Sequence, residues 1–256
     1  MSPGALREIA EAIAREAGQQ LRDAFAGPVV NVSAKSSPTD LVSEADHAAE
    51  RLIRERLASA RPGDGILGEE GGDSAGTTGL RWVVDPLDGT INFLFRIPQW
   101  AVSIACEDSD GTVTGVIYDP MRDELWSVER HGPALLDGRP VRGSERIDLA
   151  TALIATGFGY DAEVRRGQAE MVTRLIPSVR DIRRLGSAAL DLAWTAAGRY
   201  DAFYERGLNH WDRAAGELLC IQAGLVVREL PERPPAGPGV LVAPEALADP
   251  LEAFVA

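Results

Sequence analysis

The sequence predicts a mixed fold, an α+β half followed by an α/β half. In the first half, hydrophobic residues recur at helical spacing in two early segments and then at strand spacing in a run of short ones. After about residue 143, extended and helical segments alternate. The composition, 45% hydrophobic and 25% charged over 256 residues, is typical of a globular protein. We therefore divide the chain into 1–143 and 144–256, packed as one compact unit with a ligand cleft at their seam.

The first half is expected to begin with two amphipathic helices. Apolar residues follow helical spacing over 5–25, and Gly27-Pro28 ends that helix. A polar, turn-rich segment over 33–40 reads as a hairpin or loop. Ser43 then opens a second helix, which Pro62-Gly63 closes. The strands expected after it, separated by Asp-Gly or Asp-Pro turns, are 81–84, 101–107, 112–118 and 124–128.

The second half alternates between the two kinds of element, without a linker, an internal repeat or a low-complexity tract. This alternation is typical of an α/β arrangement. The expected elements are a strand over 152–155, a helix over 169–176, a strand over 179–182, a helix over 187–197, a strand over 202–204, a helix over 211–223 and a strand over 240–243.

Charge and composition argue against several classes of protein. The formal net charge of -13 disfavours a nucleic-acid or anionic-membrane partner. No apolar run is long enough to span a bilayer and no targeting segment is evident, so we expect a cytoplasmic protein. Cys106 and Cys220 are expected to be buried free thiols. The three histidines, His47, His131 and His210, are too scattered for a zinc site.

The strongest functional signal is Trp-Val-Val-Asp-Pro-Leu-Asp-Gly-Thr over 82–90. A buried strand ends in two carboxylates, Asp85 and Asp88, and Pro86 fixes the angle between them. Gly89 allows the backbone to approach a ligand, and the amides that follow could face an anion. Oxygen ligands beside free amides suit Mg²⁺ together with phosphate. On the residues alone, an ordinary acidic turn explains the segment equally well.

Two more acidic residues are candidate metal ligands. Glu69 lies in a Gly-Glu-Glu segment, and Asp212 lies in the first turn of a helix that follows a strand ending at Glu205. Singly, they read as a solvated loop and a dipole-favoured helix residue. Together with Asp85 and Asp88 they could converge on two divalent ions. No nucleophile elbow, Walker loop or dinucleotide fingerprint suggests a competing chemistry.

These segments resemble the metal-site motifs of the inositol monophosphatase family. The resemblance rests on Gly-Glu-Glu at 68–70, Trp-Val-Val-Asp-Pro-Leu-Asp-Gly-Thr-Ile-Asn-Phe at 82–93, Trp-Asp-Arg-Ala-Ala at 211–215, and a segment at 35–46 similar to the family's flexible loop and second-helix start. It runs over nearly the whole chain and is closest to bacterial members. It implies the layered α-β-α-β-α sandwich of the inositol monophosphatase and fructose-1,6-bisphosphatase type, a Mg²⁺-dependent, Li⁺-sensitive phosphatase, and a homodimer.

The resemblance also implies a set of metal ligands for two to three Mg²⁺ ions. One ion would be held by Glu69, Asp85 and the backbone carbonyl of Leu87. A second ion would be held by Asp85, Asp88 and Asp212. A third, weaker ion would lean on Glu69, and Lys35 would lie in the loop that covers it. On the residues alone, Lys35 reads equally well as a solvated charge. The implied ligands are Glu69, Asp85, Leu87, Asp88 and Asp212.

Further roles are implied for catalysis and substrate binding. The catalytic set is Glu69, Thr90 and Asp46, with the attacking water near Thr90 and the Thr90 hydroxyl oriented by Asp46. The pattern Ser43-x-x-Asp46 also allows a helix-capping role for Asp46. The implied substrate-binding residues are Asp88, Gly89, Thr90, Gly186, Ser187, Ala188, Glu205 and Asp212.

We therefore expect hydrolysis of inositol 1-phosphate to myo-inositol and phosphate by an activated water. Histidinol phosphate, whose ammonium Glu205 could face, fructose 1,6-bisphosphate and adenosine 3′,5′-bisphosphate are alternative substrates, the nucleotide disfavoured because no basic or aromatic cluster is evident. A non-catalytic regulatory protein is also considered, but all four acids are present. The segments 157–161 and 208–210 differ from animal members, which puts the leaving-group pocket in doubt.

Overall fold

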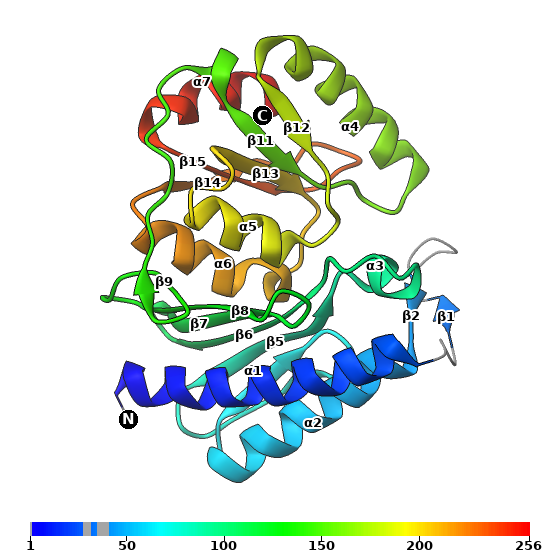
Figure 1. The fold of residues 1–256 in the computed structure, drawn as a ribbon, viewed down its shortest axis with the longest axis vertical. Helices are drawn as coiled ribbons and strands as arrows, with labels where there is room; N and C mark the ends of the chain where they lie inside the picture. Colours follow the sequence, from blue (N-terminus) through cyan, green and yellow to red (C-terminus); the bar gives the residue numbers. More distant parts are fainter. Residues whose placement is uncertain (1, 28–31, 35–40) are drawn as a thin grey trace.

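The computed structural model describes residues 2–27, 32–34 and 41–256. Over these residues the chain forms five layers in the order helices, sheet, helices, sheet, helices (Figure 1). This is the α-β-α-β-α sandwich that the resemblance implied. The centre of the hairpin or loop expected over 33–40, together with Lys35, lies outside the described residues. On either side of it, β1 (Ser33–Ala34) pairs antiparallel with β2 (Leu41–Val42).

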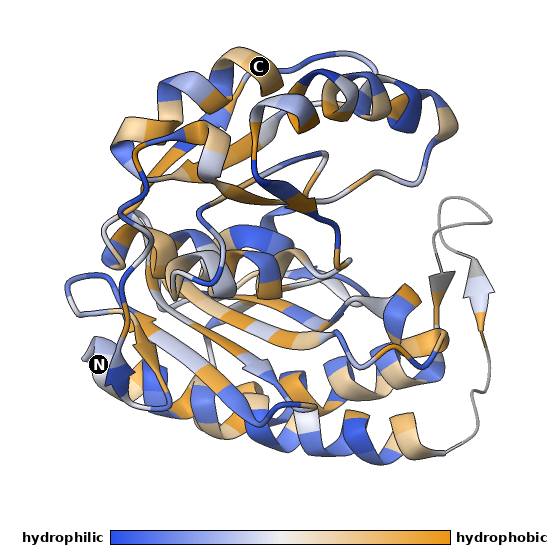
Figure 2. Ribbon diagram, turned by 45° about the horizontal axis from the view of Figure 1, so that its top comes forward, coloured by the Kyte–Doolittle hydropathy of each residue, from blue (hydrophilic) through white to orange (hydrophobic). Residues whose placement is uncertain are grey.

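The first layer consists of α1 (Pro3–Ala26) and α2 (Glu44–Ala60). Both predicted helices are confirmed, and each begins at a serine whose side chain accepts a backbone N–H: Ser2 from Ala5 and Ser43 from Ala45. Their apolar faces pack on the first sheet and bury one continuous cluster that includes Trp82. Figure 2 shows the resulting amphipathic pattern, with hydrophobic and hydrophilic stripes on the same helix.

The first sheet has eight strands, and all neighbours are antiparallel except β3 and β5. That exception positions the site, because two strand ends then meet at one edge. After β5 comes the short helix α3 (Thr90–Leu94). In spatial order the strands are β10 (Arg139–Pro140), β9 (Leu135–Leu136), β8 (Glu124–Glu129), β7 (Gly111–Asp119), β6 (Ala101–Asp108), β5 (Arg81–Asp88), β3 (Gly65–Gly68) and β4 (Gly72–Ser74).

The middle layer is formed by α5 (Ala188–Ala196) and α6 (His210–Gln222), which fill the space between the two sheets. Small residues allow the close packing. A Cβ built on Gly115 of β7 would lie 2.8 Å from Ala215 Cα, and one on Gly216 would lie 2.5 Å from Leu192 Cβ. The backbone of α6 therefore lies directly on the first sheet and against α5.

The second sheet and the last helices complete the sandwich. The sheet order is β12 (Asp181–Arg183), β11 (Leu153–Thr156), β13 (Ala202–Arg206), β15 (Gly239–Ala243) and β14 (Val226–Leu230). Its outer face is covered by α4 (Ala162–Leu175) and α7 (Glu245–Val255), with 3₁₀ turns at Leu149–Thr151 and Ile176–Ser178. The division of the chain at residue 143 stays a prediction.

Strands β3, β4, β9 and β10 of the first half were not predicted, and three elements of the second half also differ from the sequence expectation. Helix α4 begins seven residues earlier than 169, because Asp161 caps it by accepting the N–H groups of Glu163 and Val164. Strand β14 was not predicted, since only its pairing with β15 distinguishes it. Helix α7 was not predicted either, because Pro250 interrupts its helical pattern.

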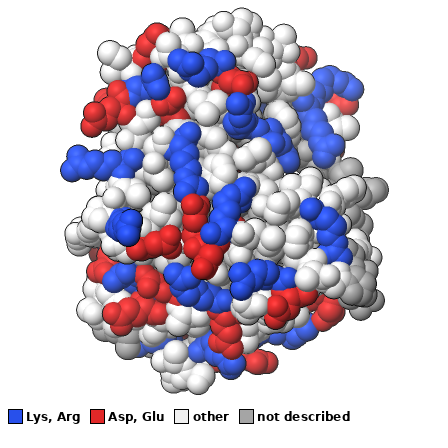
Figure 3. Space-filling model, viewed as in Figure 1, with Lys and Arg blue, Asp and Glu red and all other residues white. Residues whose placement is uncertain are grey.

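Two expectations about side chains and membrane spans can be compared with the structure. Cys106 and Cys220 are buried free thiols, as expected, and burial raises the pKa of Cys106 to about 12. Among the described residues, no helix has the length and apolar character needed to cross a bilayer. On the face seen in Figure 3, acidic and basic side chains are interspersed. Ion pairs join side chains of opposite charge in the structure, for example Arg199 and Glu124 at 2.5 Å.

Candidate active site

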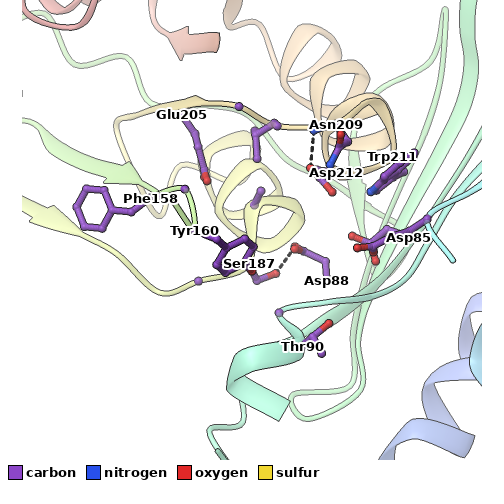
Figure 4. A pocket seen from close by; sticks show the side chains of 18 of the residues that line it. Asp85, Asp88, Thr90, Phe158, Tyr160, Ser187, Glu205, Asn209, Trp211 and Asp212 are labelled. Atoms are coloured by element: carbon purple, nitrogen blue, oxygen red, sulfur yellow. Dashed lines mark hydrogen bonds between the residues drawn. The ribbon is translucent and has the colours of Figure 1, made fainter. Parts of the chain in front are cut away.

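A pocket of about 400 Å³ opens between the two sheets and is lined by residues from both halves of the chain. Figure 4 shows Asp85, Asp88 and Asp212 directed toward a common space, with Glu205 reaching in from β13. The predicted site residues that line the pocket are Glu69, Asp85, Leu87, Asp88, Gly89, Thr90, Gly186, Ser187, Ala188, Glu205 and Asp212.

The parallel pairing of β3 with β5 brings Glu69 and Asp85 together. Gly68, the last residue of β3, is paired with Val84, and Asp85 follows Val84 directly. The N–H of Glu69 donates to the carbonyl of Val84 at 3.2 Å, which extends the pairing by one residue. Carboxyl ends of parallel strands meet at one sheet edge, so two acids 16 positions apart in sequence share it.

The acidic segment after Val84 is a bulge and not a simple turn. Between Asp85 and Asp88 the register of β5 against β6 shifts, so the strand continues with an irregularity. Asp85 Oδ1 accepts the N–H of Leu87 at 3.0 Å. Gly89 follows at φ 101°, where a Cβ would lie 2.9 Å from the Gln99 carbonyl oxygen. Glycine is therefore required at this position both for its conformation and for the close approach.

Asp88 is bound by the other half of the protein. Its Oδ2 accepts the hydroxyl of Ser187 at 2.5 Å and the N–H of Ala189 at 2.7 Å, at the N-terminus of α5 (Figure 4). Asn92 makes a second connection, because its Nδ2 donates to the carbonyls of Leu185 and Gln99, both at 2.7 Å. The segment expected to bind substrate therefore also holds Asp88, and its substrate role stays a prediction.

Asp212 lies in the first turn of α6 and lines the pocket on the side of that helix. Its Oδ2 accepts the N–H of Asn209 at 2.7 Å, and both residues form a capping box (Figure 4). The position of Asp212 in the first turn of α6 also fits the alternative considered for it, an acid favoured by the helix dipole. The same capping geometry fixes the residue at the pocket wall, where its carboxylate faces the other acids.

The acids of the pocket raise one another's pKa values. Burial, followed by the charges of Glu69, Asp88 and Asp212, holds the pKa of Asp85 well above its usual range. Burial also raises the pKa of Asp212, with Asp88 and Glu69 adding to it. The pKa of Asp88 rises to about 6 through burial, although the bonds from Ser187 and Ala189 oppose the rise. Carboxylates gathered this closely disfavour one another's ionised forms, and a bound cation would relieve that repulsion.

The donor chemistry of these residues fits a divalent cation. In the described part of the chain, no three Asp, Glu, His or Cys side chains form a finished ligand arrangement. Asp85, Asp88 and Asp212 each direct one carboxylate oxygen to a nearby N–H or O–H group and not to a common centre. All three carboxylates nevertheless line one pocket, and carboxylate oxygens are the ligands that Mg²⁺ prefers.

Asp46 satisfies both of the roles considered for it. Its Oδ2 accepts the N–H and the hydroxyl of Ser43, at 2.9 and 2.6 Å, and completes the capping box of α2. Its Oδ1 accepts the hydroxyl of Thr90 at 2.7 Å. The side chain therefore caps a helix and orients Thr90 at once, and the catalytic consequence stays a prediction.

The sequence did not single out Arg184, and it named Phe158 and Tyr160 only as part of the segment 157–161; all three line the pocket. The guanidinium carbon of Arg184 lies 5.9 Å from the Phe158 ring centroid. Burial raises the pKa of Glu205 to about 8, and the positive charge of Arg184 opposes that rise. Nothing in the spacing of these residues distinguishes them from surface residues, since only the pairing of β11 with both β12 and β13 brings them to Glu205.

Comparison with known proteins identifies relatives over the whole length of the chain. The model of the inositol monophosphatase family matches residues 4–252. An inositol-1-monophosphatase of Mycobacterium tuberculosis is 44% identical, covering 97% of this chain and 92% of the relative. A Nus factor of Salmonella typhimurium is 42% identical over 86% of this chain and 84% of its own. The crystal structure of an extragenic suppressor protein of Bartonella henselae superposes with a TM-score of 0.91, at 38% identity, and covers 98% of both chains.

Proposed function

The chain belongs to the inositol monophosphatase family, and we propose that it is a Mg²⁺-dependent phosphatase that hydrolyses inositol 1-phosphate to myo-inositol and phosphate. Family membership supports a phosphatase of small phosphate monoesters, which commonly depends on a metal. The observation that supports the metal-dependent reaction most is the convergence of four acids from three separate segments on one pocket: Glu69, Asp85, Asp88 and Asp212.

The proposed metal ligands come from one edge of the first sheet and from the first turn of α6. Glu69, Asp85 and the Leu87 carbonyl would hold one Mg²⁺, and Asp85 with Asp88 and Asp212 would hold a second, with a third, weaker ion at Glu69. When bound, the ions would neutralise the phosphate and lower the pKa of the attacking water. In the proposal, Lys35 lies in the loop covering this end of the pocket.

The residues around the metal ligands would position the reactants. The Thr90 hydroxyl donates a hydrogen bond to Asp46 at 2.7 Å, so its lone pairs are left to accept a hydrogen bond from the attacking water. Glu69 would accept from the same water. The backbone amides of Gly89 and Thr90 would donate to the phosphate. The proposed proton route uses no histidine, and none is among the described pocket residues.

The remaining pocket residues would bind the polyol. Glu205 reaches into the pocket from β13, opposite Asp88. Both carboxylates can accept sugar hydroxyls, and the backbone at Gly186, Ser187 and Ala188 borders the same space. The proposal includes three further properties: inhibition by Li⁺, a homodimer in solution and a cytoplasmic location.

A second candidate function is regulatory and not enzymatic. The observation that favours it is that a relative 42% identical to this chain is named a Nus factor. The two functions can be separated, because a purely regulatory protein need not release phosphate at any metal concentration.

The test is release of inorganic phosphate from inositol 1-phosphate over a range of Mg²⁺ concentrations, with histidinol phosphate, fructose 1,6-bisphosphate and adenosine 3′,5′-bisphosphate beside it. We expect Mg²⁺-dependent release that is fastest with inositol 1-phosphate. Another substrate ranking first would correct the specificity. No release from any substrate would favour the regulatory function.

A further inference from the structure

Two residues of α2 hold the β3–β4 loop (residues 69–71) from outside the pocket. The Oε2 of Glu50 accepts the N–H of Glu70 at 2.7 Å, and its Oε1 accepts the N–H of Gly71 at 2.8 Å. Arg54 donates from Nε to the same Oε1 at 2.6 Å and from a terminal nitrogen to the carbonyl of Gly72 at 2.6 Å. One carboxylate and one guanidinium thus bind three consecutive residues of the backbone.

Burial makes this carboxylate specific about its partners. The side chain of Glu50 is 3% exposed, against 23% for Arg54. A buried carboxylate is stable only where charge-assisted hydrogen bonds replace water, and these bonds are stronger than neutral ones. Glu50 has three of them in this structure. The loop backbone and the α2 pair therefore stabilise each other in one geometry.

Steric contacts explain why glycine flanks the two glutamates. A Cβ on Gly68 would lie 2.3 Å from Glu50 Oε1, and a Cβ on Gly71 would lie 2.6 Å from the same atom and 2.7 Å from Arg54 Nε. Neither residue has the positive φ that itself selects glycine. A side chain at either glycine would therefore push the Glu50 carboxylate or the Arg54 guanidinium out of its present position.

The backbone of Glu69 is fixed on both sides by these contacts. Its own N–H donates to Val84 of β5, and the N–H of the next residue donates to Glu50. With the peptide planes on each side held, the direction of the Glu69 side chain is set toward Asp85. Glu50 itself is not among the residues that line the pocket.

We propose that Glu50 is a positioning residue for the metal site, acting through the β3–β4 loop on Glu69. This inference rests on the proposed function only in taking Glu69 as a metal ligand. Residues that orient metal ligands from behind commonly change metal affinity or activity by about 10–100-fold when they are replaced. Glu50 should therefore affect the metal concentration needed for half-saturation more than kcat at saturating metal.

The decisive variant is Glu50→Gln, which keeps the shape of the side chain. Its amide has one oxygen, so either the N–H of Glu70 or that of Gly71 faces an NH₂ donor instead of an acceptor. We expect the half-saturating Mg²⁺ concentration for phosphate release to rise at least about tenfold, with kcat at saturating Mg²⁺ within a few-fold of the parent. Glu55→Gln, at an exposed position of the same helix, should change neither.

Two further measurements do not depend on catalysis. Binding of Mn²⁺ to the substrate-free protein, followed by electron paramagnetic resonance, should weaken in Glu50→Gln and, to a smaller degree, in Arg54→Gln. Amide hydrogen exchange at Glu70 and Gly71 should accelerate in the same variants. If Glu50→Gln does not fold, Arg54→Gln decides the question with both readouts.

Unchanged Mn²⁺ affinity and unchanged exchange at both amides would overturn the inference, because a side chain that only fills space is replaced well by glutamine. Failure of the proposed function looks different. The parent protein would then release no phosphate, while the Mn²⁺ affinities of the parent and the Glu50→Gln variant would still differ.

Discussion

The two acidic segments at the edge of the first sheet hold their shapes in different ways. The backbone of the bulged segment (residues 85–90) is shaped from within, by the bond from the Leu87 N–H to Asp85 and by the positive φ of Gly89, while Ser187 and Asp46 bind two of its side chains. The β3–β4 loop has its backbone N–H groups bound by Glu50, about 20 positions earlier in the sequence. The backbone conformation of a segment can be predicted from its own residues when local contacts determine it. The contacts that Glu50 makes with the β3–β4 loop cannot be predicted in this way, because they join distant residues.

The largest effect is expected where the bulged segment meets the second half. Asp88→Asn removes a charge from the proposed metal site but keeps the shape that Ser187 and Ala189 bind. We expect kcat to fall on the order of 10³-fold, since a metal can supply several kcal/mol of charge stabilisation. The control Asp110→Asn, at an exposed position, should keep full activity. Normal turnover by Asp88→Asn would mean that the assigned cluster is wrong.

Glu205, in the part of the pocket proposed to bind the polyol, extends the comparison. Its carboxylate has room in this position because Gly157 lacks a side chain. A Cβ on Gly157 would lie 2.0 Å from Glu205 Oε1. Burial raises the pKa of Glu205 to about 8 from an ordinary 4.5, so the folded protein retains a proton that the unfolded chain releases. Stability is therefore lost as pH rises from about 4.5 to about 8.

Glu205→Gln removes this loss and should stabilise the metal-free protein. We expect a gain on the order of 3 kcal/mol at pH 8, which corresponds to a Tm increase of about 6–12 °C, and almost no gain at pH 4. Thermal unfolding at the two pH values measures it. An equal gain at both would show that the effect is not due to ionisation. The same variant should bind inositol 1-phosphate more weakly, since an acceptor is lost.

The dependence of the β3–β4 loop on α2 can be measured with a double-mutant cycle. Gly71→Ala places a methyl group against Glu50 and Arg54, so we expect the half-saturating Mg²⁺ concentration to rise about tenfold. In a Glu50→Ala background the clash with Glu50 is absent, so the loss in the double variant should be smaller than the sum of the two single losses. Full additivity would contradict the contact. Gly167→Ala, on the exposed face of α4 with open space around it, is the matched control.

The smallest effect is expected for Ser43→Ala, which tests how the bulged segment depends on α2. This change removes the acceptor for the Ala45 N–H and the donor to Asp46 Oδ2. We expect a stability loss of about 1 kcal/mol in urea unfolding, with kcat nearly unchanged, because Thr90 still donates to Asp46 Oδ1. A large fall in kcat would show that the capping bond also orients Thr90.

Much of the fold followed from periodicity, and what did not has identifiable causes. The spacing of apolar residues predicted α1, α2 and the inner strands of the first sheet. It did not predict β14, whose five residues are defined by pairing with β15, or α7, which contains Pro250. In the site, the four acids were found because their motifs are local. Glu50, Arg184 and Gly157 were not, because their partners are distant in the sequence.

The sequence by itself determined which residues are available for chemistry and the family to which the chain belongs, since both depend on short runs of neighbouring residues. Only the tertiary structure decided how these runs meet. The parallel pairing of β3 with β5 joins Glu69 to Asp85, and the N-terminus of α5 binds Asp88. Such contacts join residues far apart in the chain, and the free energy that selects them comes from burying both partners together.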